Sequence, residues 1–138
     1  IDELGLPVRN VLERTGEGAF HAPGTLVRVL VEASHPVTWG MPREAAAFLN
    51  ARIALQTTPA RPGSTRTVLA HYPEDARDIL LSGYLKGAGQ LERKSAAAAF
   101  EVGAGRVVLF GFAAQHRAQT DGTFKLLWNA LHWAGLER

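Results

Sequence analysis

Residues 105–131, GRVVLFGFAAQHRAQTDGTFKLLWNAL, decide the fold that we expect for this chain. The segment starts with Val107, Val108, Leu109 and Phe110, an unbroken apolar run that is typical of a strand covered on both faces. A polar stretch follows this run, and an amphipathic pattern with a helical period follows the polar stretch. The segment therefore predicts a buried strand, a polar loop and a helix.

The helix is expected over residues 121–134 and is expected to pack on a sheet. One of its faces carries four large apolar side chains at helical spacing: Phe124, Leu127, Trp128 and Leu131. This spacing predicts that the face, Trp128 included, enters the core. Trp133 lies on another face of the helix, where we expect it to anchor an interface.

Further apolar runs predict the rest of the sheet. Ser95–Glu101 has a high helix propensity, but it leads through Gly103-Ala104-Gly105 into the next strand, which favours a hairpin. Pro42–Asn50 is expected to form a short helix, because proline suits a first helical position and Glu44 suits a first turn. We expect an α/β fold, a mixed β-sheet with flanking helices, in a single domain over residues 1–138. The expected strands cover residues 25–32, 52–57, 66–72, 96–102 and 106–112.

Composition excludes several classes of protein. The chain has no cysteine, which rules out disulfides, thiolate metal sites and a cysteine nucleophile. No stretch approaches 18 uninterrupted apolar residues, so we expect no membrane span. The net charge is only +2 and the basic residues are scattered along the sequence, so we expect no nucleic-acid partner.

The polar loop is the candidate site. Ligands of open α/β sheets gather outside the carboxyl ends of strands, and this loop follows such an end. The loop carries a histidine, an arginine and two glutamines beside the expected helix N-terminus. These side chains are suited to binding an anion or a sugar. Alternatively, these side chains tie down loop carbonyls while the aspartate caps the helix. The candidate ligand-binding residues are Gln115, His116, Arg117, Gln119 and Asp121.

A second pattern concerns metal binding. His71 and Glu74 have the spacing of a zinc ligand pair, and His116 or His132 could supply a third ligand. The alternative is a strand that ends in an acidic surface turn. No serine of the chain lies in a G-x-S-x-G motif, the strained turn that exposes a catalytic serine in α/β-hydrolases. We therefore assign no catalytic residue and no metal ligand within this chain.

Four segments carry a resemblance to a known family: residues 105–131, Leu6–Asn10, Pro23–Val29 and His35–Pro42. They resemble the C-terminal region of large secreted bacterial proteins that begin with a zinc carboxypeptidase domain of the carboxypeptidase A type. A glutamine-amidotransferase-like α/β domain follows the peptidase in those proteins. The resemblance implies the later part of a class I glutamine-amidotransferase-like, flavodoxin-like domain. It also implies that this chain is a fragment of a larger multidomain protein.

The same resemblance implies where the chemistry lies. Zinc is expected only in the upstream peptidase domain, and this segment is expected to hold no cofactor. Amidotransferase activity does not carry over, because its triad needs a cysteine. We expect a non-catalytic accessory or binding domain in a secreted or periplasmic protein. Its expected partner is the upstream peptidase domain, and a homo-oligomer is the alternative assembly. The alternatives are a module for sugars or peptidoglycan fragments, and a cryptic metal-dependent hydrolase that uses His71, Glu74 and His116.

Overall fold

The computed structural model describes residues 4–16 and 18–135, which form an antiparallel sheet with one α-helix packed against it. Every strand pairing in this part of the chain is antiparallel. The strands are β1 (Val8–Asn10), β2 (Thr25–Val31), β3 (Glu44–Leu49), β4 (Leu55–Thr57), β5 (Ser64–His71), β6 (Leu80–Ser82), β7 (Ser95–Val102) and β8 (Gly105–Phe110). The helices are α1 (Phe124–Gly135) and the short 3-10 helices η1 (Pro36–Thr38), η2 (Ala76–Asp78), η3 (Ala88–Gln90) and η4 (Asp121–Thr123).

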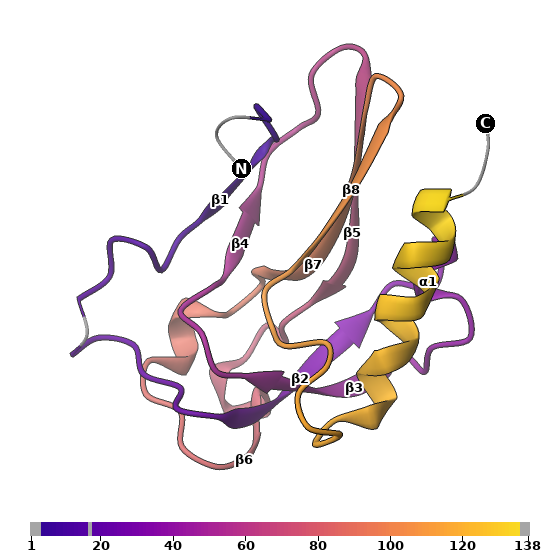
Figure 1. The fold of residues 1–138 in the computed structure, drawn as a ribbon. Coiled ribbons are helices and arrows are strands. Elements are labelled where there is room, and N and C mark those ends of the chain that lie inside the picture. The colour runs from indigo at the N-terminus through magenta and orange to yellow at the C-terminus, as the bar shows by residue number, and fades with distance from the viewer. Residues whose placement is uncertain (1–3, 17, 136–138) are drawn as a thin grey trace.

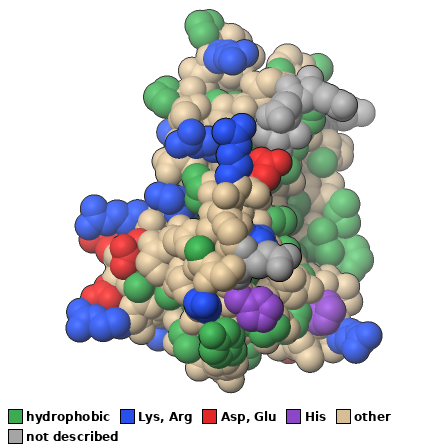
Figure 2. Space-filling model, turned by 90° about the vertical axis from the view of Figure 1, so that its left-hand side faces the viewer, with side chains coloured by type: hydrophobic (Ala, Val, Ile, Leu, Met, Phe, Trp, Pro, Cys, Tyr) green, Lys and Arg blue, Asp and Glu red, His purple; other side chains and the backbone are tan. Residues whose placement is uncertain are grey.

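The helix α1 and the strand β1 lie on opposite sides of the molecule (Figure 1). The sheet runs β1-β4-β7-β5-β2-β3, with β6 paired to β2 and β8 paired to β7. In Figure 1, β1 and β4 lie at the left, whereas α1 lies along the right-hand side. Figure 2 looks onto the left-hand side and shows many Lys and Arg side chains there, with few acidic ones.

Strand β7 is the centre of the sheet. It pairs with β5, β8 and β4, and its residues from Ser95 to Phe100 are all buried. Its alternate residues enter two core clusters: Ala97 and Ala99 belong to the larger one, whereas Ala98 and Phe100 belong to the smaller one. Two-sided pairing and burial thus override the helix propensity of the alanine run. The predicted hairpin is confirmed, with Val102 paired to Gly105 across the turn.

The expected helix over Pro42–Asn50 is wrong. Glu44–Leu49 forms β3, which pairs with β2 at six successive positions. This non-local ladder outweighs the local helix signals, and the inner residues Ala47 and Leu49 join the larger core cluster. The other predicted strands are confirmed with shifted ends, most of all residues 52–57, where only Leu55–Thr57 is a strand.

The two-sided burial expected for residues 107–110 is only partial. Val107 and Leu109 pack against the smaller core cluster, and Val108 and Phe110 pack against the larger one. All four side chains stay half-buried. The reason is that β8 pairs with β7 alone among the described strands, so its other edge is unpaired.

The helix α1 is confirmed, but the prediction that Trp128 and Leu131 enter the core and that Trp133 lies outside it is wrong. Leu126, Ala130 and Trp133 enter the larger core cluster, and Trp133 is only 5% exposed. Trp128 is 60% exposed and Leu131 is 57% exposed. Phe124 and Leu127 of the predicted face are half-buried, and Leu127 packs against the larger core cluster, so only the Trp128 and Leu131 part of that face points outward.

The C-terminal helix packed on a sheet is therefore as expected at the coarse level. The sheet is antiparallel rather than mixed, and one α-helix rather than several accompanies it in the described residues. No helix in that part of the chain is long and apolar enough to cross a membrane.

Candidate functional site

The predicted loop lies between β8 and α1 and is strongly exposed. Gln115, Arg117, Gln119 and Asp121 all face solvent, and no hydrogen bond or ion pair links their side chains. The backbone has positive φ angles at Arg117 (48°) and Ala118 (57°). Consecutive non-glycine residues in this region are strained, and such strain is concentrated at functional segments.

His116 is fixed against the sheet. Its ring stacks on Phe48 of β3, with the ring centroids 4.6 Å apart and the planes 13° from parallel. Phe48 also forms one wall of a groove of about 310 Å³, and Gln119 from the loop lines the same groove. The remaining lining residues are Gly24, Leu26, Ser82 and Gly83. The loop and the ends of β2, β3 and β6 therefore meet at this groove.

Threonines rather than Asp121 hold the loop in place. Thr123 Oγ1 donates to the Ala114 oxygen at 2.8 Å, and its contact with Thr120 Oγ1 is 3.2 Å. Both threonine side chains are buried. No side-chain cap hydrogen bond starts η4 at Thr120. Of the predicted residues, Gln119 lines the groove and His116 stacks on its Phe48 wall, whereas Gln115, Arg117 and Asp121 do not line it.

A second surface, which is not among the candidate sites predicted from the sequence, lies on the outer side of α1. Trp39, which follows η1, is 78% exposed, and Trp128 and Leu131 of α1 are exposed by more than half. We call these three residues the tryptophan face. Asn129 Nδ2 donates to the Trp39 oxygen at 3.0 Å, so the Trp39 backbone borders the helix one residue from Trp128.

Several contacts fix η1 on α1. Asn129 Nδ2 also donates to the Val37 oxygen at 3.0 Å, and Lys125 Nζ donates to the Gly40 oxygen at 3.0 Å. His35 caps η1, because its Nδ1 accepts a hydrogen bond from the Val37 N–H at 3.2 Å. The His35 ring meets the Trp133 ring edge-on, with the centroids 4.8 Å apart.

The His35 contacts have an electrostatic consequence. Burial lowers the pKa of His35 below its ordinary value of 6.5, and the nearby Glu101 carboxylate opposes this shift. A proton on Nδ1 would also remove the acceptor that caps η1. The neutral ring is therefore the form that holds the Trp39 segment in place.

The metal hypothesis finds no geometric support in the described residues. His71 Nδ1 lies 3.3 Å from a carboxylate oxygen of Glu32, whereas the Glu74 carboxylate accepts from Arg93 at 3.1 Å. His116 stacks on Phe48 instead. Nowhere in residues 4–16 and 18–135 does a group of three His, Asp or Glu side chains form a possible metal site.

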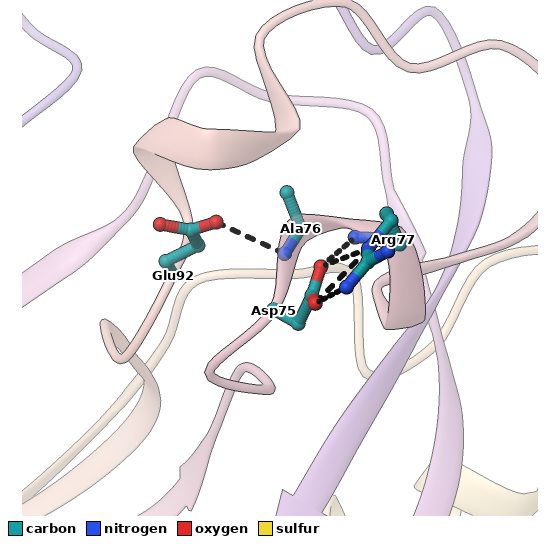
Figure 3. Close-up of polar contacts among 4 residues, drawn as sticks. All are labelled: Asp75, Ala76, Arg77 and Glu92. Carbon is teal, nitrogen blue, oxygen red and sulfur yellow. Dashed lines mark hydrogen bonds and ion pairs between the residues drawn. The ribbon is translucent and has the colours of Figure 1, made fainter.

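The acidic turn after His71 has a structural role. Asp75 accepts hydrogen bonds from the Arg77 backbone and guanidinium, which caps η2 (Figure 3). The Glu92 carboxylate accepts from the Ala76 N–H at 3.0 Å. The Arg77 hydrogen bonds lower the pKa of Asp75 to about 2. These contacts match the alternative of a surface turn at the end of a strand.

Comparison with known proteins adds no family to this description. No protein-family model and no curated protein matches the chain. The function must be argued from the geometry of the two surfaces.

Proposed function

We propose that this chain is a non-catalytic binding domain that docks onto a partner through its tryptophan face. The main observation is the exposure of Trp39, Trp128 and Leu131 on adjoining elements. Tryptophan is enriched among the residues that dominate binding energies at protein interfaces, where one such residue contributes about 2 kcal/mol or more. A hollow of about 500 Å³ beside Trp39 offers room for a partner side chain.

The proposed partner is the zinc peptidase domain upstream in the same protein. The resemblance of residues 105–131 to the C-terminal region of secreted zinc carboxypeptidases supports this partner. On this proposal the zinc belongs to the peptidase domain, and the protein is secreted or periplasmic. The finer assignment to a class I glutamine-amidotransferase-like domain rests on the same resemblance; the strand, loop and helix in order at residues 105–135 agree with it, whereas the antiparallel sheet does not.

The test measures binding of this chain to the separately produced peptidase domain by titration calorimetry. Trp128→Ser and Trp39→Ser are each expected to weaken binding by at least tenfold, because they remove exposed anchors without opening the core. Tyr84→Ser is the matched control, since Tyr84 is a large aromatic residue with 57% exposure that lies outside the tryptophan face. Equal affinities for all three variants would contradict the proposal.

A peptidase assay addresses the non-catalytic part of the proposal. The chain with added zinc is expected to hydrolyse no C-terminal peptide substrate. Clear turnover that disappears in His71→Ala would favour the cryptic hydrolase instead.

A second candidate function is the binding of a sugar or peptidoglycan fragment in the groove beside Phe48. The stacked Phe48–His116 pair offers an aromatic edge, and Gln119 and Ser82 offer polar groups. Such a mix of apolar wall and few polar groups is typical of small-ligand sites. Amide shifts of residues 115–121 are expected to move with a glycan panel and to stay fixed in Gln119→Ala. Unmoved shifts across the panel would exclude this candidate.

A further inference from the structure

Strand β8 has a free edge on which backbone groups point away from the sheet. The Gly111 N–H donates to the Ala96 oxygen at 2.7 Å, so these two residues form a hydrogen-bonded pair at the end of the ladder between β7 and β8. Such pairs alternate along an antiparallel ladder, so the N–H and C=O groups of Leu109 also face β7. Those of Val108 and Phe110 face the opposite way, and no hydrogen bond from the described residues reaches them.

Both faces of β8 are apolar along this edge. Val108 and Phe110 pack against the larger core cluster, and Val107 and Leu109 pack against the smaller one. All four side chains are only half-buried. The hairpin of β7 and β8 rises between β4 and α1 (Figure 1). A strand added at this edge would therefore cover apolar surface on both faces and bond the outward backbone groups.

The edge of β8 lacks the usual protection against pairing. Proteins protect a free edge with a charge, a proline, a bulge or a very short strand. Strand β8 pairs with β7 over six successive residues without a shift in register. Its one charged residue, Arg106, is turned toward α1, because its Nη1 donates to the Trp133 oxygen and its guanidinium lies 5.3 Å from the centre of the Trp133 ring. The charge therefore does not guard the edge at residues 107–110.

The other free edges of the described sheet are protected. Strands β1 and β6 have only three residues each. In β3, the Phe48 oxygen already accepts from the Ala113 N–H at 2.9 Å, and the other end of the strand carries the exposed Glu44, which pairs with Arg28. Among the described strands, β8 therefore has the free edge that is open to a further strand.

The sequence of β8 matches itself in antiparallel pairing. A two-fold axis at Leu109 would place Leu109 opposite its own copy and Val108 opposite Phe110 of the second copy. Val108 and Phe110 would then exchange both of their outward hydrogen bonds with the second copy, so all of these groups are satisfied. The facing pairs are apolar on both sides of the sheet, and pairs of an aromatic with a β-branched residue are favourable across strands. The two-fold contact uses the edge of both copies, so the assembly closes at two chains.

We propose that this chain forms a homodimer in which β8 pairs antiparallel with β8 of a second copy, centred on Leu109. The contact uses no residue of the tryptophan face and does not depend on the function proposed above.

The experiment measures the dimer Kd of the whole chain by sedimentation equilibrium. Val108→Pro removes an outward N–H and leaves the hydrogen bonds with β7 in place, so it is expected to raise the Kd by about tenfold or more. Leu81→Pro is the matched control, because Leu81 is exposed in β6, another edge strand, and pairs with no residue of β2. Its Kd is expected to stay within about twofold of the wild type, and circular dichroism checks that both variants fold.

Amide exchange tests the same contact without a variant, and it decides the matter if Val108→Pro fails to fold. The Val108 and Phe110 N–H groups are expected to exchange at least about tenfold more slowly at high protein concentration than at low concentration. The Ala46 N–H is the matched control. Because the Phe48 oxygen faces Ala113, alternation places the Ala46 groups on the free edge of β3, and their exchange is expected to be independent of concentration.

Four results would overturn the proposal. The first is a chain that stays monomeric at every concentration, whether or not an added apolar peptide binds the edge. The second is a dimer whose Kd is unchanged in Val108→Pro. The third is exchange at Val108 and Phe110 that does not depend on concentration. The fourth is a dimer that Trp128→Ser abolishes and Val108→Pro leaves intact, which would place the contact on the tryptophan face.

Discussion

Tyr72 is a fully buried side chain in the larger core cluster, and its hydroxyl has no hydrogen-bond partner. Burial raises the pKa of Tyr72, so the phenol stays neutral throughout the ordinary pH range. An unsatisfied buried hydroxyl costs about 1–3 kcal/mol of stability. One unpaired hydroxyl thus lowers the stability of the larger core cluster.

Removing that hydroxyl is therefore expected to stabilise the fold. Tyr72→Phe is predicted to raise the free energy of unfolding by about 1 kcal/mol, measured by urea denaturation. Tyr84→Phe is the control, since Tyr84 is exposed and its change is expected to stay within about 0.5 kcal/mol. A loss of stability in Tyr72→Phe would show that the hydroxyl has a partner in solution.

Single residues also explain what the sequence could not reveal about the candidate loop. Gln119 lines the groove and His116 stacks on its Phe48 wall, but other walls come from Gly24 and Ser82, which are far away in the chain. No local pattern predicts such a meeting. The loop itself was predicted, because polar residues after a strong apolar run are a local signal.

Among the elements, α1 shows where sequence periodicity reaches its limit. The stripe of Phe124, Leu127, Trp128 and Leu131 and the stripe of Leu126, Ala130 and Trp133 both have helical spacing. Hydrophobicity favours the first stripe, whereas the structure buries the second and leaves Trp128 and Leu131 of the first exposed. The choice depends on the shape of the sheet and of η1, which the helix sequence does not contain.

The two tryptophans of α1 test this assignment. Trp133→Ala is predicted to lower the free energy of unfolding by about 3 kcal/mol or more, because it opens a cavity in the core. Trp128→Ala is predicted to change it by less than about 1 kcal/mol, because the side chain is mostly exposed. The measurement is chemical denaturation followed by circular dichroism. The reverse order of the two losses would mean that the helix is turned the other way.

The 3-10 helix η1 is predicted to be sensitive to pH. The folded pKa of His35 lies below the unfolded value of about 6.5, so the neutral ring is favoured in the fold. Its contribution to stability is complete above about pH 6.5 and declines as the pH falls from there through the folded pKa. His35→Asn keeps a capping acceptor without titrating and is expected to flatten this dependence. Thermal unfolding between pH 5 and 8 measures it, and an equal slope in wild type and variant would contradict it.

Local signals also differ in strength between the strands. The hairpin of β7 and β8 was predictable because a short glycine-containing turn joins two apolar runs. Strand β3 was not, because its sequence carries helix signals and only its ladder with β2 makes it a strand. Pairing between strands that are distant in the chain leaves no local signal in a single sequence, so it could not be predicted.

At the scale of the whole molecule, stability is expected to be uneven across the sheet. Strand β7 is paired on both sides and buried, whereas the residues of β6 are exposed and only two of them pair with β2. Amide exchange is therefore predicted to be slowest in β7 and fastest among the strands in β6. Hydrogen–deuterium exchange by NMR measures the order. Comparable protection in the two strands would mean that the molecule opens as one unit.

The alanine run of β7 limits which substitutions evolution can accept in this strand. Ala96, Ala97, Ala98 and Ala99 are buried with almost no exposure, and side chains pack on both faces of the strand. A larger residue at any of these positions would overpack the core. Homologous proteins are therefore expected to have only glycine, alanine or serine at positions 96–99, whereas their loop sequences are expected to vary. Distant homologues would then share a sequence pattern in which a run of small residues precedes a phenylalanine and a glycine-containing turn.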